Sequence, residues 1–447
     1  MSHLATRRAR FARRRTRPLD ALRAALTLTM ALALAGVPSA RSAERGLPTA
    51  KPEQVGMSSE RLGRITELTR RYIDEGKLAG AVTLVARRGQ VVYFEAAGQA
   101  NLETGTPMEK DTLVRIYSMS KPITAVAAMM LYEEGRFQLS DPVAKFLPEL
   151  SELEVLTEDG SRVPAEPMTM QHLLSHTAGF SYGFDRNDPV DELYQESDLL
   201  GSRDLDQFVE RLSTLPLKFQ PGAQWHYSVA VDVTGAVVER ISGQPFDEFL
   251  AERIFRPLSM ADTFFAVPDD KDARFGTNHS YNAETSALEV LPVPAYPLWK
   301  DTTFFSGGGG LVSTAGDYAR FAEMLRAGGV FNGRRLLSPK TVQLMTMNHL
   351  PAVLEASTSG ERPGGPGMGG RTGSGFGLGF GVVTSVPETG VIGSKGEYSW
   401  GGAAGTIFWI DPVEDLYVVS MIQLMQSPWP LRNELKALTY QALTELN

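Results

Sequence analysis

The sequence contains no cysteine among its 447 residues. This absence excludes disulfide bonds, thiol nucleophiles and cysteine-ligated zinc, so covalent catalysis would have to use serine, threonine or lysine. The chain also lacks an excess of basic residues, since its formal net charge is −8. Nucleic acid is therefore not an expected partner, because a surface that binds it needs a basic patch.

Long apolar runs are also scarce, and the one near the N-terminus is typical of an export signal. Its apolar core, Ala24–Val37, is followed by small residues that suit cleavage and preceded by a cluster of arginines: Arg7, Arg8, Arg10, Arg13, Arg14, Arg15 and Arg17. Residues 1–43 are thus predicted to be a signal peptide. Thr6–Phe11 is a loose twin-arginine pattern, so Sec and twin-arginine export both remain open.

This N-terminus predicts an exported protein, either periplasmic or secreted. The apolar core is short for a membrane span, so we expect no stable span in the mature form. An uncleaved N-terminal anchor is the alternative.

The order of the predicted elements indicates an α+β fold with 43% hydrophobic residues available for its core. An amphipathic helix capped near Ser58 or Ser59 precedes two strands, Ala81–Ala86 and Gln90–Ala96. Helical patterns dominate the middle of the chain, and the last part returns to strands and a final helix: Gly377–Thr384, Tyr398–Trp400, Thr406–Ile410, Leu416–Ile422 and Leu431–Leu446.

We expect one folded domain over residues 44–447. Its α/β part would comprise about 50–135 and 305–447, with an antiparallel sheet built from both termini and flanked by helices. The mainly helical part would comprise about 136–304, and the active site would lie between the two parts.

The candidate for covalent chemistry is Ser118-Met119-Ser120-Lys121, which opens an apolar run, Pro122–Leu131, predicted to be a buried helix. Residues three apart on a helix share a face, so the Lys121 amine can reach the Ser118 hydroxyl. Burial of the helix would desolvate Lys121 and lower its pKa toward a value useful for a base. The spacing predicts a nucleophile and its proton acceptor, although Ser-x-x-Lys alone is a short pattern.

Acyl transfer also needs a proton relay and backbone N–H donors for an oxyanion. Tyr227 precedes the predicted helix Val231–Ile241 and could place its phenol beside Lys121; the alternative is a packed aromatic. Trp400, Gly401 and Gly402 end in small residues, as required where a strand approaches a ligand closely; the alternative is a bulged or edge strand.

Together these motifs resemble the serine β-lactamase and penicillin-binding-protein superfamily, and most closely its family VIII carboxylesterases. The resemblance extends over roughly residues 50 to 445, in the order expected for that superfamily. It rests on Ser118-Met119-Ser120-Lys121, Leu173-Leu174-Ser175-His176-Thr177-Ala178-Gly179, Tyr227, the Gly307–Thr314 segment, Gly377-Leu378-Gly379 and Trp400-Gly401-Gly402.

The resemblance implies a β-lactamase/transpeptidase-like fold and a role for each matched residue. Ser118 would be the nucleophile, Lys121 its partner and Tyr227 the general base or proton relay. The backbone N–H groups of Ser118 and Ala403 would form the oxyanion hole, and Trp400, Gly401, Gly402 and the neighbouring His226 would line the substrate pocket. Whether lysine or tyrosine takes the first proton stays open.

Two departures from the β-lactamase pattern bear on the substrate. Tyr227-Ser228-Val229 stands where those enzymes carry Tyr-x-Asn, and Trp400-Gly401-Gly402 stands where they carry Lys-Thr-Gly. An amide and a cation that would bind a β-lactam are thereby replaced, which favours uncharged short-chain carboxylic esters. We expect a small-molecule ester as substrate, weak cephalosporin hydrolysis as a side activity, and neither cofactor nor metal.

The sequence also allows other functions and other sites. A β-lactamase, a D-Ala-D-Ala carboxypeptidase and a non-catalytic relative that binds cell-wall fragments or lipids are the rival functions. Gly179-Phe180-Ser181-Tyr182-Gly183 matches the nucleophile-elbow pattern, but no strand is predicted before it. His172 and His176 could share a helix face as metal ligands, but the glutamate of a metalloprotease motif is absent.

Overall fold

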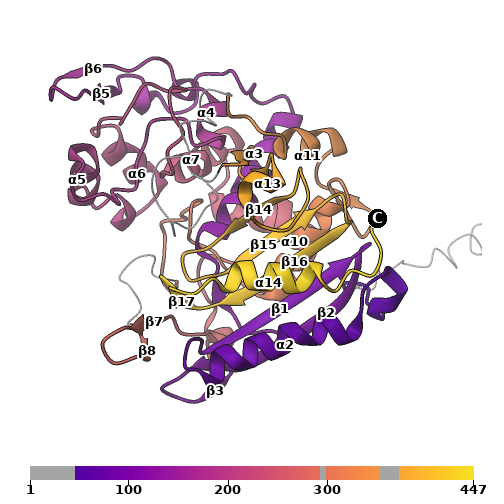
Figure 1. Ribbon diagram of the computed structural model, residues 1–447. Helices are drawn as coiled ribbons and strands as arrows, with labels where there is room; N and C mark the ends of the chain where they lie inside the picture. The colour runs from indigo at the N-terminus through magenta and orange to yellow at the C-terminus, as the bar shows by residue number, and fades with distance from the viewer. Residues whose placement is uncertain (1–45, 292–298, 352–371) are drawn as a thin grey trace, which may run out of the picture. The chain divides into compact units, whose positions relative to one another are not determined.

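The sheet of the protein is assembled from early and late segments of the chain. The computed structural model describes residues 46–291, 299–351 and 372–447, all within one compact unit, Gly46–Asn447. The strand order of the eight-stranded sheet is β12-β13-β14-β15-β16-β1-β2-β3. β16 (Leu416–Ile422) pairs with β1 (Gly80–Arg87) in antiparallel register, so the C-terminal strands join the N-terminal hairpin there (Figure 1). The predicted antiparallel sheet built from both ends is confirmed.

The remaining strands of this sheet are β2 (Gln90–Asn101), β3 (Thr106–Pro107), β12 (Ser374–Phe376), β13 (Gly381–Val383), β14 (Tyr398–Gly401) and β15 (Ile407–Asp411). β2, β14 and β15 lie at predicted positions, whereas β3 and β12 were not predicted. The single strand predicted over Gly377–Thr384 is wrong. Its first half is a hairpin turn, in which the Gly377 amide donates to the Phe380 carbonyl and Gly379 has a φ of 92°.

Two terminal helices cover one face of the sheet. α2 (Ser59–Asp74) begins at the Ser58 cap, as predicted, and contacts α14 (Leu431–Tyr440) (Figure 1). Side chains alternate along β1, so Val85 packs in the cluster with α2 and α14 while Leu84 enters the main core. α14 ends before the predicted Leu446, because Leu443 and Thr444 turn to pair with the Gly56–Met57 segment.

The opposite face carries the helix that follows the candidate serine. α3 (Ser120–Glu133) and α10 (Ala315–Arg326) belong to the main core, and α10 contacts β1, β15 and β16. Nearly all of α3 is buried, as the apolar run predicts. α3 also packs against α7 (Ala230–Ser242), which links the sheet to the helical part.

In the described part of the segment between residues 136 and 304, helices outnumber strands, of which there are four short ones. Its helices gather at one end of the view (Figure 1). Besides α7, this segment contains α4 (Met170–Leu174), α5 (Pro189–Glu196), α6 (Leu205–Leu212), α8 (Phe246–Leu250), α9 (Arg256–Leu258), β5 (Glu154–Leu156), β6 (Arg162–Pro164), β7 (His279–Asn282) and β8 (Ala287–Val290). Elsewhere lie β4 (Val114–Arg115), β9 (Val312–Ser313), β10 (Val330–Phe331), β11 (Arg334–Arg335), α11 (Pro339–Met345), α13 (Val386–Thr389) and β17 (Leu424–Met425).

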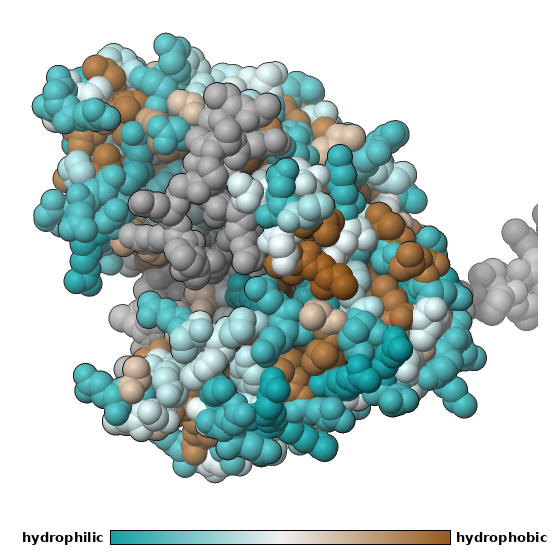
Figure 2. Space-filling view, viewed as in Figure 1, coloured by the Kyte–Doolittle hydropathy of each residue, from teal (hydrophilic) through white to brown (hydrophobic). Residues whose placement is uncertain are grey.

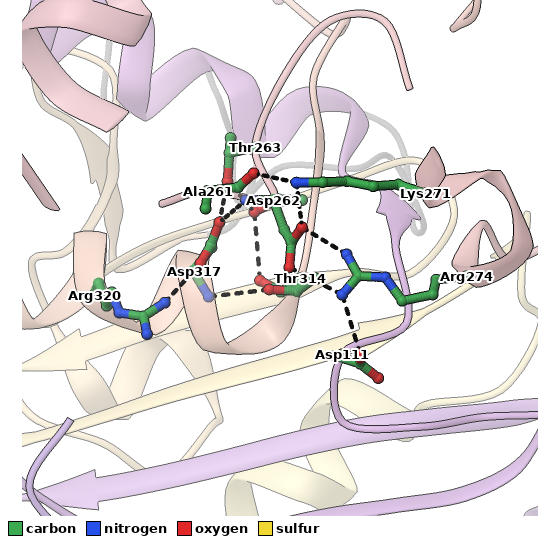
Figure 3. A network of polar contacts seen from close by, with 10 residues as sticks. Asp111, Ala261, Asp262, Thr263, Lys271, Arg274, Thr314, Asp317 and Arg320 are labelled. Carbon is green, nitrogen blue, oxygen red and sulfur yellow. Dashed lines mark hydrogen bonds and ion pairs between the residues drawn. The ribbon is translucent and has the colours of Figure 1, made fainter. Parts of the chain in front are cut away.

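A polar network fastens the start of α10 to the segment after α9 (Figure 3). Asp317 accepts hydrogen bonds from the Asp262 amide at 2.7 Å and the Thr263 hydroxyl at 3.1 Å, and it pairs with Arg320. Thr263 also bonds Ser313 of β9, which pairs with β4 three residues before Ser118. The network therefore anchors the strand pair from which the candidate serine emerges.

The surface seen in Figure 2 is largely hydrophilic, with hydrophobic residues in separate small patches. Ile392, which follows α13 in the chain, is a half-exposed hydrophobic residue. Small patches of this kind are normal on a folded protein. Within the residues that the structure describes, no helix is long and apolar enough to cross a membrane. The predicted signal peptide, residues 1–43, lies outside the described residues.

Candidate active site

Ser118 lies on a short 3-10 turn, Tyr117–Met119, and not on the α-helix predicted to contain it. α3 begins two residues later, at Ser120. In a 3-10 turn residues three apart are nearly eclipsed, so the predicted approach of Lys121 to Ser118 survives this change. The residue before the serine, Tyr117, has a φ of 45°, a conformation that costs energy for a bulky side chain. Ser118 and Tyr117 are partly exposed, whereas Met119 is buried, so the serine hydroxyl remains reachable.

Lys121 is the buried centre of the site, with a side chain 1% exposed. Its Nζ lies 3.4 Å from Ser118 Oγ, 2.8 Å from Tyr182 Oη and 2.7 Å from the Gly308 carbonyl oxygen. Burial lowers the pKa of Lys121 to about 7, although the nearby Asp232 carboxylate opposes the shift. A substantial fraction of this amine is therefore neutral near pH 7 and able to accept a proton.

Asp232, on the first turn of α7, anchors the groups around Lys121. Its carboxylate accepts hydrogen bonds from the Ser306 hydroxyl at 2.5 Å, the Gly308 amide at 3.0 Å and the Tyr182 hydroxyl at 3.3 Å. A Cβ on Gly308 would lie 2.3 Å from the Asp232 carboxylate, so this approach requires glycine. The same residue thus places Tyr182 and the Gly308 carbonyl, two of the three acceptors around Lys121.

Tyr227 brings a second phenol to Lys121, whose Nζ lies 4.6 Å from the ring centroid. Burial raises the pKa of Tyr227, and the Ser118 and Trp400 side chains partly offset that rise. The Tyr227 hydroxyl and the Trp400 indole N–H are both buried, without a hydrogen bond of ordinary geometry to the described residues. Buried polar atoms without partners are costly, so these two are available to a substrate or water.

Aromatic rings surround Tyr227 and form one wall of the site. The Tyr227 ring lies 5.6 Å from Trp400, 5.3 Å from Tyr182 and 4.9 Å from His176, measured between centroids. Phe376 contacts Trp400 from β12. The wall next to Ser118 is thus aromatic. The position where a β-lactamase would carry a cation holds the indole of Trp400.

Two backbone N–H groups complete the geometry. Within the described part of the chain, the amides of Ser118 and Ala403 donate no hydrogen bond. Ala403 follows Gly402, where a Cβ would lie 2.4 Å from the Ile116 carbonyl oxygen. The strand end and the serine turn therefore approach closely, and two free N–H donors near the serine can stabilise an oxyanion.

All the residues of this site lie within a segment that matches one protein-family model. The sequence matches the family described as Beta-lactamase over residues 65–441. The chain belongs to the beta-lactamase family.

Two curated relatives and a solved structure support this assignment. Esterase EstB of Burkholderia gladioli is 33% identical over 373 residues, covering 77% of this chain and 86% of EstB. Protein Rv1367c of Mycobacterium tuberculosis is 36% identical over 362 residues, covering 79% and 88% respectively. The structure of EstCE1, a hydrolase with promiscuous acyltransferase activity, has a TM-score of 0.72 at 28% identity and covers 86% of this chain and 99% of its own.

These comparisons show the beta-lactamase and penicillin-binding-protein fold and a resemblance to family VIII esterases, both as predicted. The antiparallel sheet, its flanking helices and the helical part are arranged as this family membership implies. The chain is therefore a serine hydrolase of the beta-lactamase family.

His226, predicted to line the pocket of this beta-lactamase-family protein, lies in a neighbouring polar cluster. Its Nε2 is 3.3 Å from Ser181 Oγ, and Ser181 donates to Asp191 at 2.5 Å. Burial lowers the pKa of His226 to about 4, and the Lys218 ammonium adds to the shift. Ser181 and His226 directly precede Tyr182 and Tyr227 in the chain, so their contact holds the two tyrosine segments together.

The alternative sites lack the geometry for their chemistry. Ser181 is buried, and its hydroxyl bonds a carboxylate and a histidine that is neutral, in a segment preceded by the helix α4. His176 is fully buried against aromatic rings, and burial lowers its pKa far below the usual value. Among the described residues, no group of three or more histidine and acidic side chains is placed to hold a metal ion.

Sequence reasoning missed Tyr182 and Asp232. Tyr182 stands inside the Gly-x-Ser-x-Gly pattern that drew attention to Ser181, one residue away. Asp232 is a lone carboxylate in the apolar run Ala230–Val238, and it is fully buried. A single acid on an otherwise apolar helix is costly unless it has partners, so this signal was available in the sequence.

Proposed function

We propose that this protein hydrolyses short-chain carboxylic esters through a covalent acyl-enzyme on Ser118. One observation carries the proposal: Lys121 is buried beside Ser118 Oγ, and burial lowers its pKa to about 7. A neutral amine at this position can take the serine proton while the serine oxygen attacks the ester carbonyl.

The two pKa shifts support Lys121 as the first base and Tyr227 as a relay. Burial disfavours the phenolate of Tyr227, whereas it favours the neutral amine of Lys121. The Ser118 proton passes to Lys121, and the carbonyl oxygen becomes an oxyanion held by the Ser118 and Ala403 amides. Collapse breaks the C–O bond, and the leaving alkoxide takes a proton through the Tyr227 phenol.

Deacylation runs through the same groups. A water molecule attacks the acyl-enzyme carbonyl, gives up a proton to the Lys121–Tyr227 pair, and releases the acid as Ser118 regains its hydrogen. Since each proton that leaves the nucleophile returns to a leaving oxygen, no cofactor is needed for the cycle.

The apolar wall supports an uncharged ester over a β-lactam or a peptide carboxylate. Trp400 is 2% exposed and supplies an indole where a cation would bind a substrate carboxylate. EstB, at 33% identity, is named an esterase. Weak cephalosporin hydrolysis is proposed as a side activity of the same acyl-enzyme.

A substrate panel tests this proposal. p-Nitrophenyl acetate and butyrate should be hydrolysed with a kcat/KM at least about 100-fold above that for a chromogenic cephalosporin or a D-Ala-D-Ala peptide. Preference for the cephalosporin would indicate a β-lactamase, and preference for the peptide a carboxypeptidase. No turnover of any substrate by folded protein would favour the binding relative.

Replacing Tyr227 with phenylalanine should lower kcat for p-nitrophenyl butyrate by about 100-fold, because the relay proton is lost. Thermal stability should be retained, since the hydroxyl has no hydrogen-bond partner among the described residues. Tyr417→Phe is the matched control: its hydroxyl is also buried without such a partner, but it lies on β16. Equal rates for the two variants would remove Tyr227 from the proton path.

A further inference from the structure

The peptide group between Gly402 and Ala403 connects the site to the start of α14. Its N–H is the Ala403 amide, one of the two free donors near Ser118. Its carbonyl oxygen, on Gly402, accepts a hydrogen bond from Arg432 Nη2 at 2.8 Å. One planar unit therefore has a free N–H at one end and a guanidinium contact at the other.

Arg432 directs its charge at backbone carbonyls. Its Nη2 also lies 3.2 Å from the Thr406 carbonyl oxygen, and no described carboxylate pairs with it. Burial lowers the pKa of Arg432 to about 10, so the group stays charged at neutral pH. A partly buried cation without a carboxylate is costly unless other dipoles stabilise it, and these two carbonyls are the dipoles that it meets.

The sequence makes room for this contact. A Cβ on Gly401 would lie 2.9 Å from Arg432 Nη1, and one on Gly402 would meet the Ile116 carbonyl oxygen. The two glycines after Trp400 thus serve different neighbours: Gly401 leaves space for the guanidinium, and Gly402 lets the loop approach the serine turn. The Gly402 amide donates to the Thr406 carbonyl at 2.8 Å, which closes the loop around Ala403.

A charged donor on a peptide oxygen polarises the whole amide and strengthens the N–H at its other end. We propose that Arg432 is a positioning residue for the oxyanion hole: it orients and polarises the Gly402–Ala403 peptide so that the Ala403 N–H stabilises the anionic tetrahedral intermediate. This inference rests on the proposed acyl-enzyme function. It assigns a catalytic consequence to a residue of the C-terminal helix α14.

The test compares Arg432→Met and Arg432→Lys with the wild type and with Arg64→Met. Arg64 is an exposed arginine of α2 that contacts Gln441 just after α14, so its loss controls for removing an arginine near that helix. Three quantities are measured: kcat and KM for p-nitrophenyl butyrate, Tm, and the inhibition constant of phenylboronic acid. The boronic acid probes the oxyanion hole because Ser118 Oγ adds to boron and gives a tetrahedral anion, while the serine proton moves to Lys121.

Arg432→Met should lower kcat by about 10- to 100-fold and weaken phenylboronic acid by a similar factor, with KM changed less than about threefold. Arg432→Lys should recover part of both losses, since an ammonium can donate to the Gly402 carbonyl but lacks the planar fork. Arg64→Met should match the wild type in all three quantities.

A purely structural arginine would give a different result. If Arg432→Met lowers Tm or raises KM while boronic acid binds as tightly as to the wild type, the inference is wrong. If the methionine variant does not fold, Arg432→Gln takes its place, because its neutral amide lacks the charge that polarises the peptide; an unchanged kcat and boronic acid constant in that variant would equally overturn the inference. Failure of the proposed function is distinct: the wild type itself would then neither hydrolyse the ester nor bind the boronic acid, and the inference would fall with it.

Discussion

Replacing Ser118 with alanine is expected to lower ester hydrolysis by at least about 10⁴-fold, because the oxygen that forms the acyl-enzyme is gone. Folding should be almost unaffected. Ser118 is partly exposed, and its hydroxyl meets the Lys121 amine only at 3.4 Å. A surface change of this size shifts the free energy of unfolding by about 0.5 kcal/mol or less, or roughly 1 °C in Tm. Initial rates with p-nitrophenyl butyrate and a thermal melt measure both.

The control for this experiment is Ser181→Ala, in the competing Gly-x-Ser-x-Gly pattern. Ser181 is buried and donates to Asp191, so its loss should cost about 1–3 kcal/mol of stability. The variant should nevertheless react with a fluorophosphonate, and peptide mapping should place the adduct on Ser118. An adduct on Ser181 of the wild-type protein, or full activity in Ser118→Ala, would overturn the site assignment.

Local patterns predicted the parts of the site that lie close together in the chain. The spacing of Ser118 and Lys121 fixes their approach whether the turn is α or 3-10, so an error in helix type did not matter. Short, mainly apolar runs at both ends of the chain likewise predicted the sheet, and β1 and β16 are buried along their whole length. Family resemblance then selected Tyr227 from other tyrosines that precede helices.

Contacts between distant segments were not predictable from one sequence. Tyr182 reaches Lys121 across 61 positions, and Arg432 reaches the Gly402 carbonyl across 30. Neither residue belongs to a periodic pattern, and each gains its role from how α4, α7, β14 and α14 pack. The turn at Gly377–Phe380 was missed for a related reason, because apolar residues between glycines satisfy a strand pattern equally well.

Replacing Lys121 with methionine is expected to lower kcat/KM for p-nitrophenyl butyrate by about 10³-fold, because the serine loses its first proton acceptor. Tm should fall, because the Gly308 carbonyl and the Tyr182 hydroxyl lose the amine that they contact, so the rate must be measured below the melting range. Lys218→Met is the control: Lys218 bonds Asp188 and Asp191 in the neighbouring cluster and should leave the rate largely unchanged.

The role of Lys121 as a base also predicts the direction in which the rate changes with pH. A neutral amine is the active form, so wild-type kcat/KM should rise with pH through about 7, where Lys121 loses its proton. The Asp232 carboxylate raises the pKa of Lys121, so Asp232→Asn should move this limb to lower pH even as the loss of anchoring reduces the maximum rate. Lys121→Met should lack the limb altogether. A limb that moves to higher pH in Asp232→Asn, or persists in Lys121→Met, would assign the titration to a group other than Lys121.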